Sequence, residues 1–252
     1  LFCLRLLDFV QDPLLGRLAS RMQGRRGLSI AVAGFAMAAA MAGLFAVTPP
    51  LMPIIWFALM LTVVFSAFSY LTICFYAQGV AAAGAMPGEG HLRLARWRET
   101  GALLGICAAA IAPIVLGSFA GFALSFVILA ALALWAMNGD WRRASIPSQG
   151  FGPVLRDAVS RRLLMVALVN AAPVAVSSTL FLFFVESRLD APGWEGPLLL
   201  LFFLSAALAA PFWGRAAEIW GAKSVLLAGM VLSILAFAGV ATLGTGDTWA
   251  FG

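Results

Sequence analysis

The sequence is dominated by long apolar runs that short polar segments separate. Eight runs can be traced, the first of them short, at 1–15, 28–47, 54–79, 101–116, 121–137, 163–185, 194–213 and 222–243. About 20 mainly apolar residues cross the hydrocarbon core of a bilayer as one helix. Hydrophobic residues make up 63% of the chain and charged residues 11%, which leaves too few polar side chains to cover a soluble globule. We therefore predict an all-α, polytopic membrane protein and exclude a disordered chain, a disulfide scaffold and a soluble enzyme.

The basic residues are distributed unevenly between the connections. Every Lys and Arg except Arg5 and Arg188 falls in alternate connections between the predicted helices. Such asymmetry marks the cytoplasmic side of a membrane protein, so the net charge of +5 indicates cytoplasmic loops and no nucleic-acid partner. The longest polar stretch, 138–162, is predicted to be a cytoplasmic linker. It would join an N-terminal helical bundle, 1–137, to the start of a C-terminal bundle, 163–252.

A weak internal repeat links the two predicted bundles. Gly16-Arg17-Leu18-Ala19 follows the first apolar run, and Gly214-Arg215-Ala216-Ala217 follows the seventh. The two copies are six predicted helices apart. Parallel repeats of six helices are typical of one large class of membrane transporters.

The first run carries three charged residues within the predicted membrane span. Arg5, Asp8 and Asp12 are spaced by three and four residues, which places them on one face of a helix. A charge at the bilayer centre costs about 2.5–3.5 kcal/mol on insertion scales, so these groups must be paired or face water. If Arg5 neutralises one carboxylate, the other is available to an exchangeable cation or proton. The alternative is structural: Asp8 pairs with Arg5, and Asp12-Pro13 marks the helix end.

These residues carry a resemblance to a known family. The motif Arg5-x-x-Asp8-x-x-x-Asp12-Pro13-x-x-Gly16, followed by Arg21 and Gly24-Arg25-Arg26, resembles helix II and the next loop of the glycoside–pentoside–hexuronide:cation symporters. That family is the melibiose-permease-like branch of the major facilitator superfamily. Four later segments resemble its helices IV, V, VII and VIII in order: Ser69–Ala77, Arg93–Glu99, Asn170–Pro173 and Pro211–Trp213. The resemblance implies a major facilitator-type bundle in which the chain is a fragment covering helices II to IX.

The resemblance also implies a function and a set of site residues. We expect a secondary active transporter in an inner (plasma) membrane of bacterial type, moving a sugar-like or other small solute by alternating access. Its partners would be the solute and the lipid bilayer, and it would need no cofactor besides a coupling ion, H⁺ or Na⁺. Cation or proton coupling is expected at Asp8, Asp12 and Arg5, with any sodium site at Asp8 and Asp12. The solute site is expected at Arg98. A gating motif is expected at Gly16, Arg21, Gly24 and Arg25.

Three polar side chains in the helix IV-like and helix VII-like segments are further candidates for the solute site. Tyr70 and Tyr76 in the third run could line a cavity, or could pack with an internal hydrogen bond. Asn170 could contact solute or hydrogen-bond to a neighbouring helix.

Departures from the family pattern bear on the coupling ion and on the solute. Ile73 stands where the family has an acidic or amide residue, Phe75 replaces a proline, and Ser20 replaces an acidic residue. Sodium needs several oxygen ligands, whereas a proton needs one carboxylate, so Ile73 favours proton coupling. Two alternatives stay open. The first is a lipid or amphiphile transporter of the same superfamily, which the apolar Ile73, Cys74 and Phe75 favour. The second is a non-transporting membrane receptor or scaffold, which the intramembrane charges disfavour.

Overall fold

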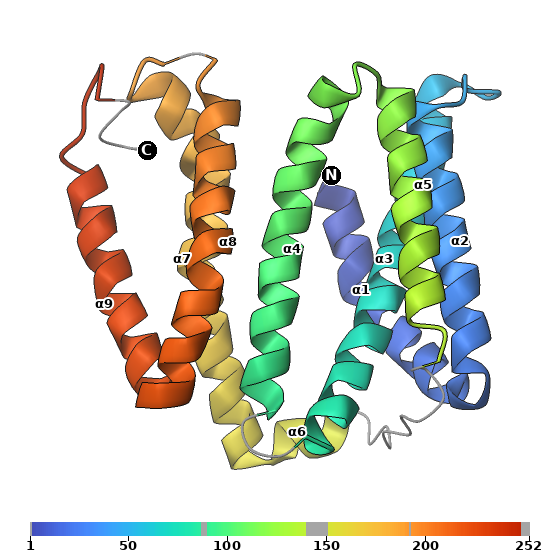
Figure 1. Ribbon diagram of the computed structural model, residues 1–252, viewed down its shortest axis with the longest axis horizontal. Coiled ribbons are helices and arrows are strands. Elements are labelled where there is room, and N and C mark those ends of the chain that lie inside the picture. The colour runs from blue at the N-terminus through green and yellow to red at the C-terminus, as the bar shows by residue number, and fades with distance from the viewer. Residues whose placement is uncertain (1, 87–89, 140–150, 192, 248–252) are drawn as a thin grey trace. The chain divides into compact units, whose positions relative to one another are not determined.

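The computed structural model contains long helices joined by short connections (Figure 1). It describes residues 2–86, 90–139, 151–191 and 193–247, and gives the backbone alone for 2–10, 151, 153–154, 174–175, 177–179 and 182. In this part of the chain the long helices are α1 Phe2–Arg21, α2 Arg26–Phe45, α3 Pro53–Gly84, α4 Gly90–Val115, α5 Phe119–Ala136, α7 Ala158–Ser187, α8 Glu195–Trp220 and α9 Ala222–Val240. Two short elements are the 3₁₀ turn η1, Gln23–Arg25, and the helix α6, Phe151–Arg156.

The predicted all-α class is confirmed, and each of the eight apolar runs lies within or overlaps one long helix. Among the described residues, six stretches are long and apolar enough to cross a membrane: Gln23–Phe45, α3, α4, α5, α8 and α9. The other two long helices are α1 and α7. In α1 the charged Arg5, Asp8 and Asp12 lower the hydropathy of a helix that is otherwise rich in Leu and Phe.

Several helices extend beyond the apolar runs from which they were predicted. α4 begins at Gly90 where the run begins at 101, and α8 continues to Trp220 where the run ends at 213. At 1.5 Å per residue, 26 residues measure about 39 Å, more than the roughly 30 Å of a hydrocarbon core. Hydropathy therefore located the apolar part of each helix and missed the polar turns that extend it.

The predicted linker 138–162 contains helix in its described part. Residues 140–150 lie outside the described residues, α6 follows them, and α7 begins at Ala158. The Asp157 carboxylate caps α7 by accepting a hydrogen bond from the Ser160 backbone N–H at 2.8 Å. That bond lowers the pKa of the Asp157 carboxyl below its usual value, because it stabilises the charged form.

The described chain divides into two compact units. The first unit comprises residues up to 94 together with 108–139, and α2 packs there against both α3 and α5. Its core contains Ala19, Ile30, Tyr70 and Cys74. Close contact between these helices depends on small residues, since a Cβ on Gly34 of α2 would lie 2.7 Å from Leu134 Cδ1 of α5.

The second unit comprises residues 95–107 of α4 and the described residues from 151 onward. Its core contains Val185, Leu189, Ala191 and Leu198, at the end of α7 and the start of α8. The Arg188 Nε donates a hydrogen bond to the Leu243 carbonyl at 3.0 Å, which ties the end of α7 to the segment after α9.

The contact between Gly34 and Leu134 yields a stability prediction. We expect Gly34→Ala to lower the free energy of unfolding by about 1 kcal/mol, because the added methyl overlaps Leu134. The matched control is Gly27→Ala in the same helix, where nothing lies within 4 Å of the added Cβ. Thermal unfolding of the purified protein in detergent should show a lower midpoint for Gly34→Ala alone. Equal midpoints for the two variants would contradict the packing described here.

Candidate functional site

Helix α1 places the acidic candidates beside α3. The Ser66 hydroxyl of α3 donates a hydrogen bond to Gln11 Oε1 of α1 at 2.9 Å. Asp12, the next residue, has an exposed side chain, and among the described side chains the structure records no ion pair for it. The polar pair Gln11–Ser66 therefore fixes the helix that carries Asp12, while the Asp12 carboxylate stays accessible.

Arg5 and Asp8 lie on the same helix, but their side chains fall outside the described residues. The α-helical backbone of α1 extends from Phe2 to Arg21, so positions 5, 8 and 12 share one face as the spacing predicts. The described residues contain no group of three or more His, Cys, Asp or Glu that could hold a metal ion. A sodium site at Asp8 and Asp12 stays a prediction.

The two candidate tyrosines of α3 have different surroundings. Tyr70 is buried, and its hydroxyl donates a hydrogen bond to Ser29 Oγ of α2 at 2.8 Å. Tyr76 is 47% exposed. Six residues of helix rotate the side chain by about 600°, so the two rings point about 120° apart. In this structure Tyr70 joins α3 to α2, and Tyr76 is the tyrosine whose ring is accessible.

The Tyr70–Ser29 bond belongs to a buried polar cluster at the start of α2. Ser29 Oγ in turn donates to the Arg26 carbonyl at 2.9 Å, and the Cys74 side chain is fully buried beside Tyr70. Arg26 is only 4% exposed. The sequence places Arg26 among the basic residues of a predicted cytoplasmic connection, yet its side chain is buried in the first unit.

The structure shows the contacts of two residues that depart from the family pattern, Ile73 and Ser20. Ile73 packs against the buried cluster that contains Ala19, Ile30 and Tyr70. Ser20 donates its hydroxyl to the Arg17 carbonyl of its own helix at 2.8 Å. Neither side chain contributes a charge, and Ile73 offers no oxygen ligand.

The predicted gating motif forms the end of α1 and the turn that follows. Gly16 lies within α1 with nothing within 4 Å of a built Cβ, and Arg21 is its last residue. Gly24 and Arg25 form η1, and the side chains of Arg21 and Arg25 are exposed. The motif therefore presents two accessible guanidinium groups where the chain turns into α2.

Arg98, the predicted solute-binding arginine, forms an ion pair with the adjacent residue Glu99. Arg98 of α4 donates from Nε and Nη2 to Glu99 Oε1, at 3.1 and 2.7 Å. One third of the Arg98 side chain is exposed. Asn170 of α7 is also exposed. Both residues lie in the second unit, so the structure does not join them to Asp12 or Tyr76 in one described site.

An interhelical ion pair in the second unit was not predicted. Arg96 Nη1 of α4 lies 3.1 Å from Glu218 Oε1 of α8, and the two side chains are 16% and 32% exposed. Gly214 lies one helical turn before Glu218. A Cβ at Gly214 would lie 2.7 Å from Arg96 Cγ and closer still to its Cδ, so α8 accommodates the arginine stem only because position 214 is glycine.

The sequence indicated two of the residues at this contact but not the contact itself. Gly214 is the first residue of the second repeat copy, and Arg96 is one of the basic residues that precede the fourth run. Their contact joins residues 118 positions apart in the chain, which spacing alone does not reveal. Gln11 and Ser66 are likewise polar residues in two different runs, and only the fold brings them together.

The packing of Arg96 against Gly214 yields a second prediction. We expect Gly214→Ala to displace the Arg96 side chain and break its ion pair. In the wild type, Glu218→Gln should cost about 0.5–1 kcal/mol of stability, and in the Gly214→Ala background it should cost nothing further. Thermal unfolding of the single and double variants measures this difference, with Gly229→Ala in the open part of α9 as control. An unchanged cost of Glu218→Gln in both backgrounds would show that the glycine does not support the pair.

Comparison with known proteins gives one match. The sequence profile of the family described as MFS/sugar transport protein matches residues 1–252. No curated protein and no solved structure matches the chain at a significant level. The apolar helices agree with an integral membrane protein. The chain therefore belongs to the MFS/sugar transport protein family, whose members are membrane transporters.

Proposed function

We propose that this transporter couples the movement of a sugar-like solute to the movement of a proton, by alternating access of two helical bundles. The observation that carries the proposal is the exposed Asp12 carboxylate on the charged face of α1, beside the Gln11–Ser66 bond to α3. Family membership supports a sugar-like solute. The helix II motif supports placing the chain in the melibiose-permease-like branch.

The charged face of α1 is the proposed coupling element. An accessible carboxylate in an apolar helix is costly while it is charged, and either a proton or a cation removes that cost. Ion occupancy at Asp8 or Asp12 therefore changes the energy of any arrangement that buries this face. A ligand shifts a conformational equilibrium only if it binds the two conformations with different affinity. An ion that binds more tightly when this face of α1 is buried would therefore drive the bundles toward the conformation that buries it.

The proton is the coupling ion that the surroundings of α3 favour. A sodium site on α1 would need oxygen ligands from a neighbouring helix, and position 73 supplies a packed isoleucine. α3 contains no Asp or Glu, so it supplies no second carboxylate to a cation at Asp12. A proton needs no such shell.

The solute contact is assigned to Arg98, as the helix V resemblance implies. Arg98 presents a partly exposed guanidinium that donates two hydrogen bonds to Glu99. A guanidinium is a planar set of donors that suits the hydroxyl oxygens of a sugar-like solute. The basic turn at Arg21 and Arg25 would then belong to the cytoplasmic gate.

Transport measurements test the coupling. We expect the full-length protein in proteoliposomes to accumulate at least one member of a panel of tritiated mono- and disaccharides under an imposed proton gradient. Asp12→Asn and Asp8→Asn should each reduce gradient-driven accumulation at least tenfold and leave exchange of solute at equilibrium largely intact, because they remove coupling while keeping the fold. Ser20→Ala, a neutral change in the same helix, is the control. Accumulation that a sodium gradient alone drives would overturn proton coupling.

The orientation of the chain is a separate prediction. We expect the linker and the start of α7 to be cytoplasmic and the α7–α8 connection to face the opposite side, as the distribution of basic residues indicates. Gly152→Cys and Asp190→Cys both introduce a thiol at an exposed position. A membrane-impermeant maleimide applied to intact cells should label position 190 alone. Labelling of position 152 from outside would reverse the topology.

A further inference from the structure

The predicted gating motif turns the chain from α1 into α2, and this turn has little support of its own. η1 lies between the two helices and contains two backbone hydrogen bonds of 2.9 Å, from Met22 N–H to the Leu18 carbonyl and from Arg25 N–H to the Met22 carbonyl. Among the described residues, no side chain caps the start of η1 or of α2 by a hydrogen bond. Support for the turn must therefore come from the residues on either side of it.

Both sides of the turn rest on the same two residues of α3. Tyr70 and Cys74, one helical turn apart, are buried together with Ala19 and Ile30. Ala19 lies near the end of α1, just before the turn, and Ile30 lies near the start of α2, just after it. The middle of α3 thus forms the surface on which the chain reverses.

A chain of hydrogen bonds leads from α3 to the residue that directly follows η1. The Tyr70 hydroxyl donates to Ser29 Oγ at 2.8 Å, and Ser29 Oγ donates to the Arg26 carbonyl at 2.9 Å. The α3 hydroxyl is therefore linked through a single side chain to the backbone of the turn. A buried hydroxyl that loses its partner leaves a costly unsatisfied group, so this link resists displacement.

A buried cation reinforces the link. The side chain of Arg26 is 4% exposed, whereas those of Arg21 and Arg25 are exposed. Its guanidinium acts electrostatically on both the Tyr70 hydroxyl and the Cys74 thiol, so it belongs to the same core. Burying a guanidinium is costly unless the protein supplies partners for it. An arginine needed only as a basic charge in the connection would be exposed like its two neighbours, so the burial of Arg26 indicates a packing role.

We propose that Tyr70 is a positioning residue for the gating turn. Together with Cys74 it holds Arg26, and through Arg26 it sets the orientation in which Arg21 and Arg25 are presented. This inference rests on the proposed function, in which that turn belongs to the cytoplasmic gate. Tyr70 then acts on transport through the turn and does not contact the solute.

Spin labelling of the full-length protein tests the positioning. Gly24→Cys introduces a labelling site in η1, and Gly229→Cys introduces one on α9 in the second unit; nothing lies within 4 Å of an added Cβ at either position. The protein without an introduced cysteine measures background labelling. Tyr70→Phe removes one hydroxyl and keeps the ring. It should raise the mobile fraction of the label at position 24 at least twofold and leave the label at position 229 unchanged.

Two further variants control this measurement. Thr62→Val removes an α3 hydroxyl that donates to the Ala58 carbonyl of its own helix at 2.7 Å, so both labels should keep their mobility. Arg26→Gln should mobilise the label at position 24 as Tyr70→Phe does; should it fail to fold, Tyr70→Phe alone decides. Unchanged mobility at position 24 in Tyr70→Phe would overturn the proposal. An equal increase at positions 24 and 229 would also overturn it, because that is the result of a general loss of stability.

Transport by the same variant separates positioning from solute contact. For a tritiated sugar that the wild type accumulates, Tyr70→Phe should lower the maximal rate at least threefold and leave KM unchanged. A raised KM with an unchanged label at position 24 would make Tyr70 a solute contact and refute its positioning role. Normal transport by the double variant Arg21→Gln, Arg25→Gln would instead contradict the cytoplasmic gate of the proposed function. The label at position 24 distinguishes the two failures, since its spectrum requires neither solute nor coupling ion.

Discussion

The structure of the first unit depends on the fact that hydrocarbon offers no hydrogen-bond partners. Each polar group within a membrane helix must find its partner in the protein. Among the described side chains, three bonds between helices help to meet this requirement. Ser66 to Gln11 joins α3 to α1, Tyr70 to Ser29 joins α3 to α2, and Trp56 to Gly43 joins them again near the other end of α2. All three donors belong to α3. This helix therefore fixes the positions of both neighbours, including the one that carries Asp12.

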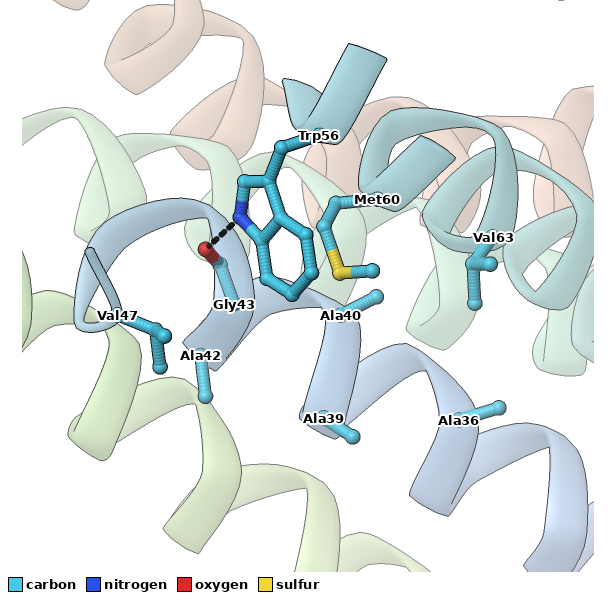
Figure 2. Close-up of a pocket in the computed structure, with 9 residues that line it drawn as sticks. All are labelled: Ala36, Ala39, Ala40, Ala42, Gly43, Val47, Trp56, Met60 and Val63. Atoms are coloured by element: carbon cyan, nitrogen blue, oxygen red, sulfur yellow. Dashed lines mark hydrogen bonds between the residues drawn. The ribbon is translucent and has the colours of Figure 1, made fainter. Parts of the chain in front are cut away.

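Packing without a hydrophobic driving force explains the small residues of α2. Lipid tails are as apolar as leucine, so helices associate in a membrane through close contact and interhelical hydrogen bonds. Gly34 admits Leu134 of α5, and Gly43 admits Met60 of α3. α2 can thus contact two helices at once. The same lack of side-chain volume forms an apolar hollow on α2 beside Met60 (Figure 2).

The sequence predicted the helices well because an apolar run of membrane length has few other structures available to it. It predicted their ends poorly, since the basic turns around Arg96 and Arg215 continue as helix beyond the apolar runs. For the candidate site the spacing predicted that positions 5, 8 and 12 share a helix face, and α1 continues through all three as helix. The role of Asp12 stays a prediction. The partners of Tyr70 and Arg96 were not predictable, because each bond joins residues from different helices, and nothing in the local pattern specifies which helices meet.

The pairing of Arg98 with Glu99 would affect selectivity if Arg98 binds the solute as proposed. Such a solute would have to displace the carboxylate of the adjacent residue, which competes at a high effective concentration. The internal anion would therefore raise the threshold of recognition, and Glu99 would lose its cation whenever Arg98 is occupied. A solute with a hydroxyl donor could bond to the released carboxylate, whereas an anionic solute would be repelled by it. On this proposal the pair would favour neutral polyols over acids.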